Sequence, residues 1–245
     1  MNSSEKIKFI SNWIKTYVDQ MPSKAKSLVI GISGGIDSSV SSTLCAMTGI
    51  KTIVLTMPIR QKDNQHDLSL KHQEWLIKNF KNVEAHTINL DKLFESFSST
   101  LEKFDNEHGY ANSRARLRMT TLYQVAAANK GIVVGTGNKV EDFGVGFYTK
   151  YGDGGVDISP IADCNKTEVW ELGKELGILK EIIDAPPTDG LWDDGRTDEG
   201  QLGFKYEDLE DAMKNPNSPH RQEYEKIRKQ NLHKMEPIPV CKIPS

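Results

Sequence analysis

The stretch GISGGIDSSV, residues 31–40, places two adjacent glycines, one acid and three serines directly after the apolar run SLVI. Gly34 and Gly35 permit backbone torsions and a close approach that a Cβ would forbid, so consecutive N–H groups can converge on phosphate oxygens. A helix that starts here adds the partial positive charge of its N-terminus. Hydroxyl donors to the same anion come from Ser33, Ser38 and Ser39. The stretch therefore predicts a phosphate-binding turn.

The acid in this stretch, Asp37, indicates a cation. A carboxylate repels a neighbouring phosphate unless a cation lies between them, and Mg²⁺ is such a cation. The alternative is that Ser33 or Asp37 only caps the helix, but a cap needs only one of them. The stretch also differs from the GxxxxGK[ST] and GxGxxG phosphate-binding patterns. We therefore expect Asp37 to hold Mg²⁺ beside the phosphates.

Strands and helices alternate along the first half of the chain, as a parallel sheet requires. Apolar residues Ile7, Ile10, Ile14 and Val18 recur at helical spacing and predict an N-terminal helix that ends before Pro22. Short apolar runs predict strands at residues 27–32, 52–57, 83–90 and 131–136. Helical patterns follow at residues 38–47, 67–80, 93–101 and 113–130. The alternation predicts an α/β fold with a doubly wound parallel sheet flanked by helices, and it places the phosphate-binding turn at the carboxyl edge of that sheet.

The second half of the chain has a different character. Residues 135–160 are rich in glycine and lack a long periodic element, so we expect loops over the carboxyl edge of the sheet. A helix is predicted at 166–177, and the segment that follows at 185–205 is dense in Pro, Gly and Asp. Two more helices are expected at 206–213 and 221–233. The length of 245 residues suits one large domain that spans residues 1–245.

The overall charge and the cysteines exclude several classes of protein. The 31 basic and 34 acidic residues give a net charge of −3, which provides no global attraction to nucleic acid or an anionic membrane. No apolar run approaches the roughly 20 residues that cross a bilayer, and the N-terminus lacks the apolar core of a signal peptide. Cys45, Cys164 and Cys241 are far apart and favour neither a disulfide framework nor a zinc site. We expect a cytoplasmic protein that binds neither nucleic acid nor membranes.

The motif SGGIDSS resembles the pyrophosphate-binding loop of the N-type ATP pyrophosphatases. Six later segments resemble, in order and approximate spacing, the motifs of the ammonia-dependent NAD synthetase family: NSRARLRM, GTGNKVE, FYTKYGDGGVD, NKTEVWELGKELG, PPTDGLWDD and a C-terminal HK. The resemblance implies an adenine nucleotide alpha-hydrolase-like, Rossmann-like fold. It also implies that the chain amidates deamido-NAD with ammonia in the last step of NAD biosynthesis. ATP would be split into AMP and pyrophosphate through an adenylated intermediate.

The resemblance assigns the phosphate-binding turn and three further residues to ATP. In the turn these are Gly31, Ile32, Ser33, Gly34, Gly35, Ile36, Asp37, Ser38 and Ser39. The further ATP contacts are Thr136, Lys166 and Thr188. Lys166 begins its predicted helix, where a positive charge is unfavourable unless an anion is nearby, and a solvated lysine is the alternative interpretation. The reaction needs no nucleophilic side chain, so Ser33 and Lys166 are expected to stabilise transition-state charge.

Two acids are candidates to share the cation with Asp37. Thr136 and Glu141 follow the apolar run GIVV at the same sheet edge as the phosphate-binding turn, so Glu141 can face Asp37 across one cation. The resemblance makes Glu141 the second Mg²⁺ ligand. The segment between this acid and the next Thr-Lys pair is one residue longer than in the shorter family pattern. Asp142 therefore stays open as the alternative ligand.

The resemblance assigns residues from three separate segments to deamido-NAD. They are Asn112, Arg116, Tyr148, Lys150, Asp157, His233 and Lys234. Arg116 matches the arginine of the family's N-x-K-A-R pattern, in which Arg114 takes the place of the lysine. Either Phe147 or Tyr148 could stack on the pyridine ring, and a buried core role for these aromatic residues is an equally open alternative.

The resemblance also implies a homodimer, and free ammonia as the nitrogen donor, because the chain has no room for an amidohydrolase domain. We expect residues 185–204 and 60–67 to close over bound ligand and exclude water. Two other functions stay open. A tRNA-thiolating enzyme would generally use reactive cysteines and a basic RNA surface. A non-catalytic nucleotide-binding α/β module would need neither the paired carboxylates nor the KYGDGGVD segment.

Overall fold

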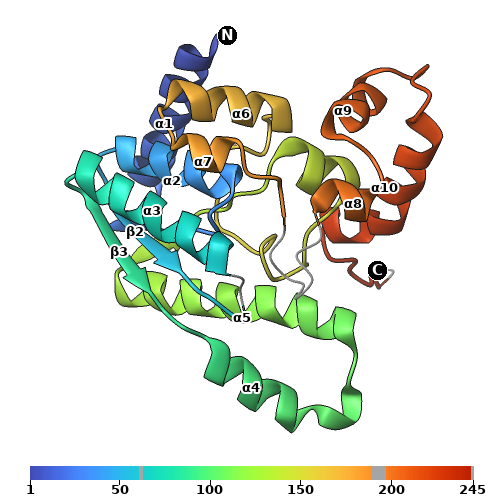
Figure 1. Ribbon diagram of the computed structural model, residues 1–245, viewed down its shortest axis with the longest axis horizontal. Helices are drawn as coiled ribbons and strands as arrows, with labels where there is room; N and C mark the ends of the chain where they lie inside the picture. Colours follow the sequence, from blue (N-terminus) through green and yellow to red (C-terminus); the bar gives the residue numbers. More distant parts are fainter. Residues whose placement is uncertain (61–62, 189–196, 244–245) are drawn as a thin grey trace.

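A four-stranded parallel sheet lies between two layers of helices, in the left half of Figure 1. The computed structural model describes residues 1–60, 63–188 and 197–243. The strands are β1 (Ser27–Gly31), β2 (Lys51–Thr56), β3 (Val83–Thr87) and β4 (Gly131–Val133), in the order β3-β2-β1-β4. Neighbouring strands are parallel, and Ser27 is aligned with both Lys51 and Gly131. The predicted α/β fold with a doubly wound parallel sheet is confirmed.

Helices cover both faces of the sheet (Figure 1). One face carries α1 (Ser3–Gln20), α2 (Ile36–Met47), α3 (Asp63–Asn79) and α6 (Lys166–Glu175). The other carries α4 (Asp91–Thr100) and α5 (Glu107–Ala128), which the short 3-10 helix η1 (Glu102–Phe104) joins. Each face of the sheet packs with its helices in one hydrophobic cluster. Alternation along β1 explains the two layers, because Leu28 and Ile30 belong to the cluster with α1, α2, α3 and α6, and Val29 belongs to the cluster with α4 and α5. Burial on both faces accounts for the nearly continuous apolar runs of the strands.

The order of the strands creates a switch point between β1 and β4. The chain adds β2 and β3 on one side of β1 and then returns to place β4 on the other side. The segments that follow β1 and β4 therefore leave the sheet side by side at its carboxyl edge. In open parallel sheets, ligands bind in the crevice at such a point.

Most predicted elements are present with shifted ends. α2 begins at Ile36, two residues earlier than expected, because the extended backbone of Gly35 serves as its N-cap. β3 and β4 end at Thr87 and Val133, three residues short of the predicted strands. Beyond β4, the N–H of Val134 donates to the carbonyl of Val29 in β1, and Val134 forms an isolated parallel bridge with Ile158. The sequence pattern located the elements correctly and overestimated the paired length of the last two strands.

The segment after β4 contains a π-helix, η2 (Lys139–Val145), where only loops were expected. That expectation was wrong for these seven residues. Asn138 caps the start of η2 by accepting hydrogen bonds from the N–H groups of Val140 and Glu141. Gly146, whose φ is 70°, ends it in the left-handed conformation. A π-helix is a rare element that frequently occurs at functional sites.

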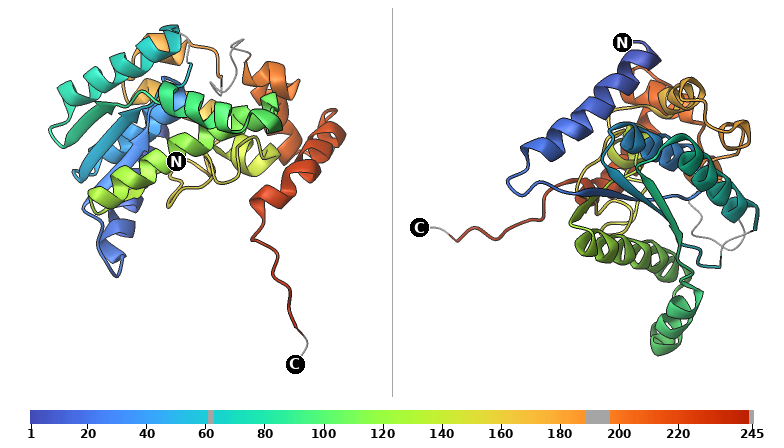
Figure 2. Two further views of the ribbon diagram at one scale, coloured as in Figure 1. Left: turned by 90° about the horizontal axis from the view of Figure 1, so that it is seen from below. Right: turned by 90° about the vertical axis from the view of Figure 1, so that its left-hand side faces the viewer.

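The remaining helices are α7 (Lys180–Ile183), α8 (Asp198–Leu202), α9 (Tyr206–Lys214) and α10 (Arg221–Met235). α9 and α10 confirm the predicted C-terminal helices, whereas the short α7 and α8 were not predicted. We call α8, α9 and α10 the C-terminal helical unit, and Figure 1 shows it beside the sheet layers. Its core joins that of η2 in a third cluster, made by Val140, Val145, Tyr206, Leu209, Ala212 and Tyr224. Residues 236–243, after α10, extend away from this unit (Figure 2).

Both segments expected to close over a ligand fall partly outside the described residues. The undescribed residues are 61–62 and 189–196 within the chain and 244–245 at its end. Within the described part of the chain, every helix is too short or too polar to cross a lipid bilayer.

Candidate active site

One cavity at the carboxyl edge of the sheet collects nearly all the residues predicted to bind ATP. It lies at the switch point, between the turn after β1 and the segment after β4. The predicted ATP-binding residues in its lining are Gly31, Ile32, Ser33, Gly34, Gly35, Ile36, Asp37, Ser38, Thr136, Lys166 and Thr188. Ser39 is the one predicted ATP contact outside this lining. The fold therefore brings together residues from four separate parts of the chain.

The hydrogen bonds of the turn after β1 explain the position of Ser39. Gly34 has a φ of 89°, which a residue with a side chain rarely adopts. The carbonyl of Gly35 accepts hydrogen bonds from the hydroxyls of Ser38, at 3.0 Å, and Ser39, at 2.9 Å. Ser39 is fully buried, whereas Ser33 is exposed and its Oγ lies 3.1 Å from Ser38 Oγ. Ser33 and Ser38 can thus reach an anion in the cavity, and Ser39 supports the turn.

A buried lysine bridges two acids at the edge of this turn. Lys166 Nζ lies 2.5 Å from Asp37 Oδ2 and 2.9 Å from Glu141 Oε1. The side chain of Lys166 is 2% exposed, and those of Asp37 and Glu141 are 16% and 15% exposed. One ammonium faces two carboxylates, so the three groups together carry one surplus negative charge when all are ionised.

The pKa values of the three groups reflect this balance. Burial raises the pKa of Asp37, although the ammonium of Lys166 acts in the opposite direction. Burial also opposes ionisation of Glu141, but Lys166 and the hydroxyl of Tyr206 outweigh it and lower the pKa of Glu141. Burial disfavours the ammonium of Lys166, and the two carboxylates outweigh it and raise the pKa of Lys166. Lys166 therefore stays charged, and the site can accept further positive charge.

Asn138 supports both acids, a role that the sequence analysis missed. Asn138 is fully buried, and its Nδ2 donates to Asp37 Oδ1 at 3.0 Å. Its Oδ1 accepts from the backbone N–H of Glu141 at 3.1 Å. Asparagine is a preferred residue immediately before a helix, so the sequence carried a signal for the cap. It carried none for the bond to Asp37, which depends on the tertiary fold.

Asp142, the alternative ligand, also lines the cavity but packs against Gly137. A Cβ at Gly137 would lie 1.9 Å from Asp142 Oδ2, so only glycine fits beside this carboxylate. Burial raises the pKa of Asp142 well above its ordinary value, and the nearby acids Asp153, Glu141 and Asp37 raise it further. The acid that shares Lys166 with Asp37 is Glu141.

Tyr206 reaches the same cluster from the C-terminal helical unit. Its hydroxyl donates to Glu141 Oε1 at 2.5 Å and lies 3.4 Å from Asp198 Oδ2. Lys166 Nζ lies 4.9 Å from the centre of the Tyr206 ring. Tyr206 was not among the predicted site residues, because a tyrosine at the start of an amphipathic helix gives no local signal of a polar contact.

The acids fit a magnesium ion. Mg²⁺ is usually bound through one or two carboxylates and completes its octahedron with waters and substrate phosphates. Asp37 at the start of α2 and Glu141 in η2 supply two carboxylates, and both contact the same ammonium. That ammonium marks a point between the acids where a positive charge is already stabilised.

The residues predicted to bind deamido-NAD form a second group outside the lining of this cavity. The group links α5 to the loop at 147–157. Thr149 Oγ1 donates to Asn112 Oδ1 at 2.7 Å, and Arg116 Nε donates to the carbonyl of Lys150 at 3.2 Å. The fold thus places Asn112 and Arg116 beside the segment that carries Lys150.

α10 contacts the same loop through two lysines. Lys150 Nζ donates to the carbonyl of His233 at 3.1 Å, and Lys234 Nζ donates to the carbonyl of Tyr148 at 2.8 Å. Lys234 Nζ also lies 5.0 Å from the centre of the Tyr148 ring. Of the two candidate stacking residues, Phe147 lines the cavity and Tyr148 packs beneath Lys234.

Asp157, the last predicted substrate residue, has structural contacts. Its Oδ2 accepts a hydrogen bond from the N–H of Val133 at 2.7 Å, and its Oδ1 accepts one from the hydroxyl of Tyr123 at 3.1 Å. These bonds attach the loop to the end of β4 and to α5. The role of Asp157 in substrate binding stays a prediction.

Fold and site together define a nucleotide-binding α/β enzyme. Its phosphate-binding turn, paired acids and buried lysine meet at the switch point of a parallel sheet. More particularly, the chain belongs to the NAD synthase family, whose model matches residues 6–243. Members of this family are ligases that form a carbon–nitrogen bond and use ATP. Neither alternative raised from the sequence is favoured by this assignment.

Known proteins similar to this chain support the same assignment. The NH(3)-dependent NAD(+) synthetase of Carboxydothermus hydrogenoformans is 37% identical over 216 residues, which cover 86% of this chain and 85% of the relative. The NH(3)-dependent NAD(+) synthetase of Finegoldia magna is 36% identical, and the match covers 96% of this chain and 94% of the relative. The solved structure of NMN synthetase from Francisella tularensis superposes on this chain with a TM-score of 0.91 and 32% sequence identity. The superposition covers 99% of this chain and 100% of the other.

Proposed function

We propose that this protein amidates deamido-NAD with ammonia, using ATP, and releases NAD, AMP and pyrophosphate. The observation that carries the proposal is the convergence of the phosphate-binding turn, Lys166 and two acids on one cavity. The names of the curated relatives, NH(3)-dependent NAD(+) synthetases, support both ammonia as the donor and NAD as the product.

In the first step, a carboxylate oxygen of the nicotinate ring attacks the α-phosphorus of ATP. The bond from that phosphorus to the oxygen bridging to the β-phosphate breaks, and pyrophosphate leaves. The chain acts by positioning and by neutralising charge. The backbone amides at Gly34 and Gly35 and the hydroxyls of Ser33 and Ser38 would hold the leaving phosphates. Lys166 would offset the charge that develops between the α- and β-phosphates.

Asp37 and Glu141 are the proposed ligands of Mg²⁺, which when bound neutralises charge on the phosphate oxygens. The contact of both acids with Lys166 supports this pair over Asp37 with Asp142. Asn138 would keep Asp37 in place throughout, because it donates to the carboxylate oxygen that Lys166 does not contact.

In the second step, the nitrogen of ammonia attacks the carbonyl carbon of the adenylate. The bond from that carbon to the AMP oxygen breaks, AMP leaves, and the nitrogen loses one proton. The substrate is proposed to be held by Asn112, Arg116, Tyr148, Lys150, Asp157, His233 and Lys234. Water must be excluded because it would hydrolyse the adenylate. Ala185, Pro187 and Thr188 line the cavity, and this supports a covering role for the segment that they begin.

A second candidate is the same chemistry on nicotinic acid mononucleotide, which would give NMN. The similarity to the NMN synthetase of Francisella tularensis, with a TM-score of 0.91, favours it. Both substrates carry the same nicotinate carboxylate and differ only in the adenylyl half. The adenylation and amidation steps are therefore unchanged, and only substrate recognition would differ.

We further propose a homodimer of single-domain chains, residues 1–245, that acts in the cytoplasm. The family resemblance supports the dimer. Light scattering of the purified protein should give twice the chain mass of 27.5 kDa. A mass of one chain at the concentration used for activity assays would rule the dimer out.

Pyrophosphate release tests the proposed function. The protein is incubated with MgATP and ammonium chloride, and with deamido-NAD, nicotinic acid mononucleotide or neither. Release should require one of the two nucleotides, and the ratio of their kcat/KM values identifies the substrate. Equal release without either nucleotide would contradict the proposal.

A further inference from the structure

We infer that Tyr206 is a positioning residue for the proposed cation site, and that its hydroxyl fixes the carboxylate of Glu141 in the orientation that faces Asp37. The inference rests on the proposed function, because it takes Glu141 to be a metal ligand. It adds a residue from the C-terminal helical unit to a site that otherwise consists of residues from the sheet edge and α6.

The hydroxyl of Tyr206 has one proton and two carboxylates within reach. Its oxygen lies 2.5 Å from Glu141 Oε1 and 3.4 Å from Asp198 Oδ2. The shorter separation is typical of a charge-assisted bond between a hydroxyl and a carboxylate. The proton is therefore donated to Glu141, and Asp198 is the more distant neighbour.

Tyr206 is itself held firmly. It is fully buried at the first residue of α9. The ring of Trp170 packs against it edge-on, with 5.9 Å between ring centres and an interplanar angle of 88°. Its backbone N–H donates to Glu199 Oε1 at 3.2 Å. A hydrogen bond from so constrained a donor restricts the rotamers of Glu141.

The restriction matters because Lys166, another donor to Glu141, is also proposed to bind the phosphates of ATP. Glu141 Oε1 also accepts from Lys166 at 2.9 Å, and Lys166 is the proposed partner of the ATP phosphates. When the ammonium shifts toward those phosphates, the bond from Tyr206 continues to hold Glu141. Loss of a group that orients a ligating carboxylate typically lowers metal affinity about 10- to 100-fold.

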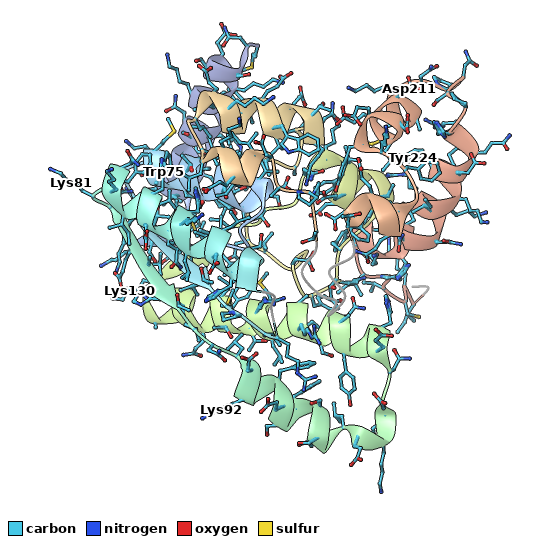
Figure 3. All side chains as sticks on the ribbon, viewed as in Figure 1. Trp75, Lys81, Lys92, Lys130, Asp211 and Tyr224 are labelled. Carbon is cyan, nitrogen blue, oxygen red and sulfur yellow. The ribbon has the colours of Figure 1, made fainter. Side chains whose placement is uncertain are left out.

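The test compares two tyrosine-to-phenylalanine variants. Tyr206→Phe removes only the hydroxyl and keeps the ring that packs on Trp170. Tyr224→Phe is the matched control, because Tyr224 lies in the same hydrophobic cluster but contacts Arg221 in α10. Figure 3 labels Tyr224 among the C-terminal helices. Thermal melting establishes that each variant is folded.

The first readout is binding of Mn²⁺, measured by electron paramagnetic resonance in the presence of α,β-methylene-ATP and without any acceptor substrate. Tyr206→Phe should bind Mn²⁺ about 10- to 100-fold more weakly than the wild type, and Tyr224→Phe should bind it equally well. The Mg²⁺ concentration for half-maximal pyrophosphate release should rise by a similar factor, with kcat at saturating Mg²⁺ within a few-fold. Wild-type Mn²⁺ affinity in folded Tyr206→Phe would overturn the inference.

A double variant tests whether Tyr206 acts through Glu141. In a Glu141→Gln background, adding Tyr206→Phe should cause little further loss of Mn²⁺ affinity. An additional loss as large as in the wild-type background would overturn the inference. Should Tyr206→Phe fail to fold, Tyr206→His restores a ring N–H donor. A folded Tyr206→His protein would then be expected to bind Mn²⁺ within about 10-fold of the wild type, and a loss beyond the 100-fold range would contradict the inference.

Failure of the inference and failure of the proposed function give different results. If wild-type protein releases pyrophosphate only with a nicotinic acid nucleotide, the function stands whatever Tyr206→Phe does. If the wild-type protein does not bind Mn²⁺ with the ATP analogue and does not release pyrophosphate, it is the proposed function that fails.

Discussion

Two carboxylates share one ammonium where Asp37, Glu141 and Lys166 meet, and their contacts are 2.5 and 2.9 Å long. Triphosphate brings further negative charge to this point, so the acids would weaken ATP binding unless a divalent cation accompanied the nucleotide. The proposed Mg²⁺ site would thus make the cavity select MgATP over free ATP. Two substitutions test the roles of individual charges at this site.

Asp37→Asn should leave the fold intact and reduce pyrophosphate release at least about 100-fold, because metal neutralisation of phosphate charge contributes several kcal/mol. The side chain of the variant has the same shape but only one acceptor oxygen, so it keeps the hydrogen bond from either Asn138 or Lys166 and loses the other. The protein should therefore stay folded but melt at a somewhat lower temperature than the wild type. Pyrophosphate release and a melting curve on the same preparation provide the comparison. Substantial residual turnover would mean that Asp37 acts only as a helix cap.

Asp142→Asn should stabilise the protein at neutral pH. Burial raises the pKa of Asp142, so the folded chain binds this proton more tightly than the unfolded chain, and native stability falls as pH rises through that window. The asparagine variant does not pay the cost of ionising a buried carboxyl group. It should therefore melt about 2–4 °C higher at pH 7, the shift that 1 kcal/mol gives in a domain of this size.

Melting curves at several pH values check the sign of this effect. The difference should vanish as pH falls toward the ordinary aspartate pKa of about 3.9. If Glu141 is the ligand, Asp142→Asn also retains its Mg²⁺ dependence. A large rise in the Mg²⁺ requirement would instead identify Asp142 as the ligand.

Among the elements, those with strong periodic patterns were predicted from the sequence and the others depended on distant contacts. Both faces of the sheet are buried, so its strands appear as continuous apolar runs that a sequence pattern detects. α7 and α8 have 4 and 5 residues, too few for a helical period to be recognised. η2 is held from α10, where Arg228 and Asn231 donate to carbonyls of Phe143, Gly144 and Val145. Contacts across more than 80 residues leave no local pattern.

The same distinction holds for the site. The residues that motifs and resemblance assigned to ATP line the cavity at the switch point, apart from Ser39, and most of them lie in the short segments after β1 and β4. Their binding of ATP stays a prediction. Asn138 and Tyr206 were missed because their importance comes from contacts with Asp37 and Glu141 that only the fold creates. Ser39 was assigned with its neighbours, and its burial in α2 explains why it braces the turn.

Asn138→Ala tests the element that carries Glu141. The substitution removes the cap of η2 and a hydrogen bond to Asp37, so stability should fall by about 1–2 kcal/mol. Pyrophosphate release should fall as well, about 10-fold or more, because both proposed metal ligands lose support. Denaturant unfolding and steady-state kinetics measure the two effects.

Asn106→Ala is the matched control for this change. Asn106 caps α5 by accepting from the N–H of Gly109 at 2.7 Å. Its loss should destabilise the protein to a similar degree without changing the Mg²⁺ dependence. If Asn138→Ala and Asn106→Ala reduced turnover equally, the effect of Asn138 would reflect stability alone.

Over the whole molecule, the cavity at the switch point and the second group use different side chains, although both draw on α5 and the loop at 147–157. The first belongs to the switch point of the sheet, and the second connects α5, the loop at 147–157 and α10. The C-terminal helical unit serves both, since α9 supplies Tyr206 to the acids and α10 supplies His233 and Lys234 to the loop. Substitutions in the two surfaces should therefore separate kinetically.

Arg116→Ala should raise KM for the nicotinic acid nucleotide about 10- to 100-fold, which is the loss of one hydrogen bond to a charged group, worth about 1.5–3 kcal/mol. The KM for ATP should stay within a few-fold of the wild type. Initial rates at varied concentrations of each substrate, with Arg116→Lys as the charge-conserving comparison, measure the split. A parallel rise in both KM values would argue against a separate substrate surface.

The central claim is that the cavity transfers the adenylyl group of ATP to a nicotinate carboxylate. Oxygen labelling tests it most directly: the accepted nucleotide is prepared with both carboxylate oxygens as ¹⁸O and converted with MgATP and ammonia. The account predicts that the AMP product carries one ¹⁸O, because the attacking oxygen leaves with AMP when nitrogen displaces it. Unlabelled AMP, formed together with the amide, would contradict an adenylated intermediate.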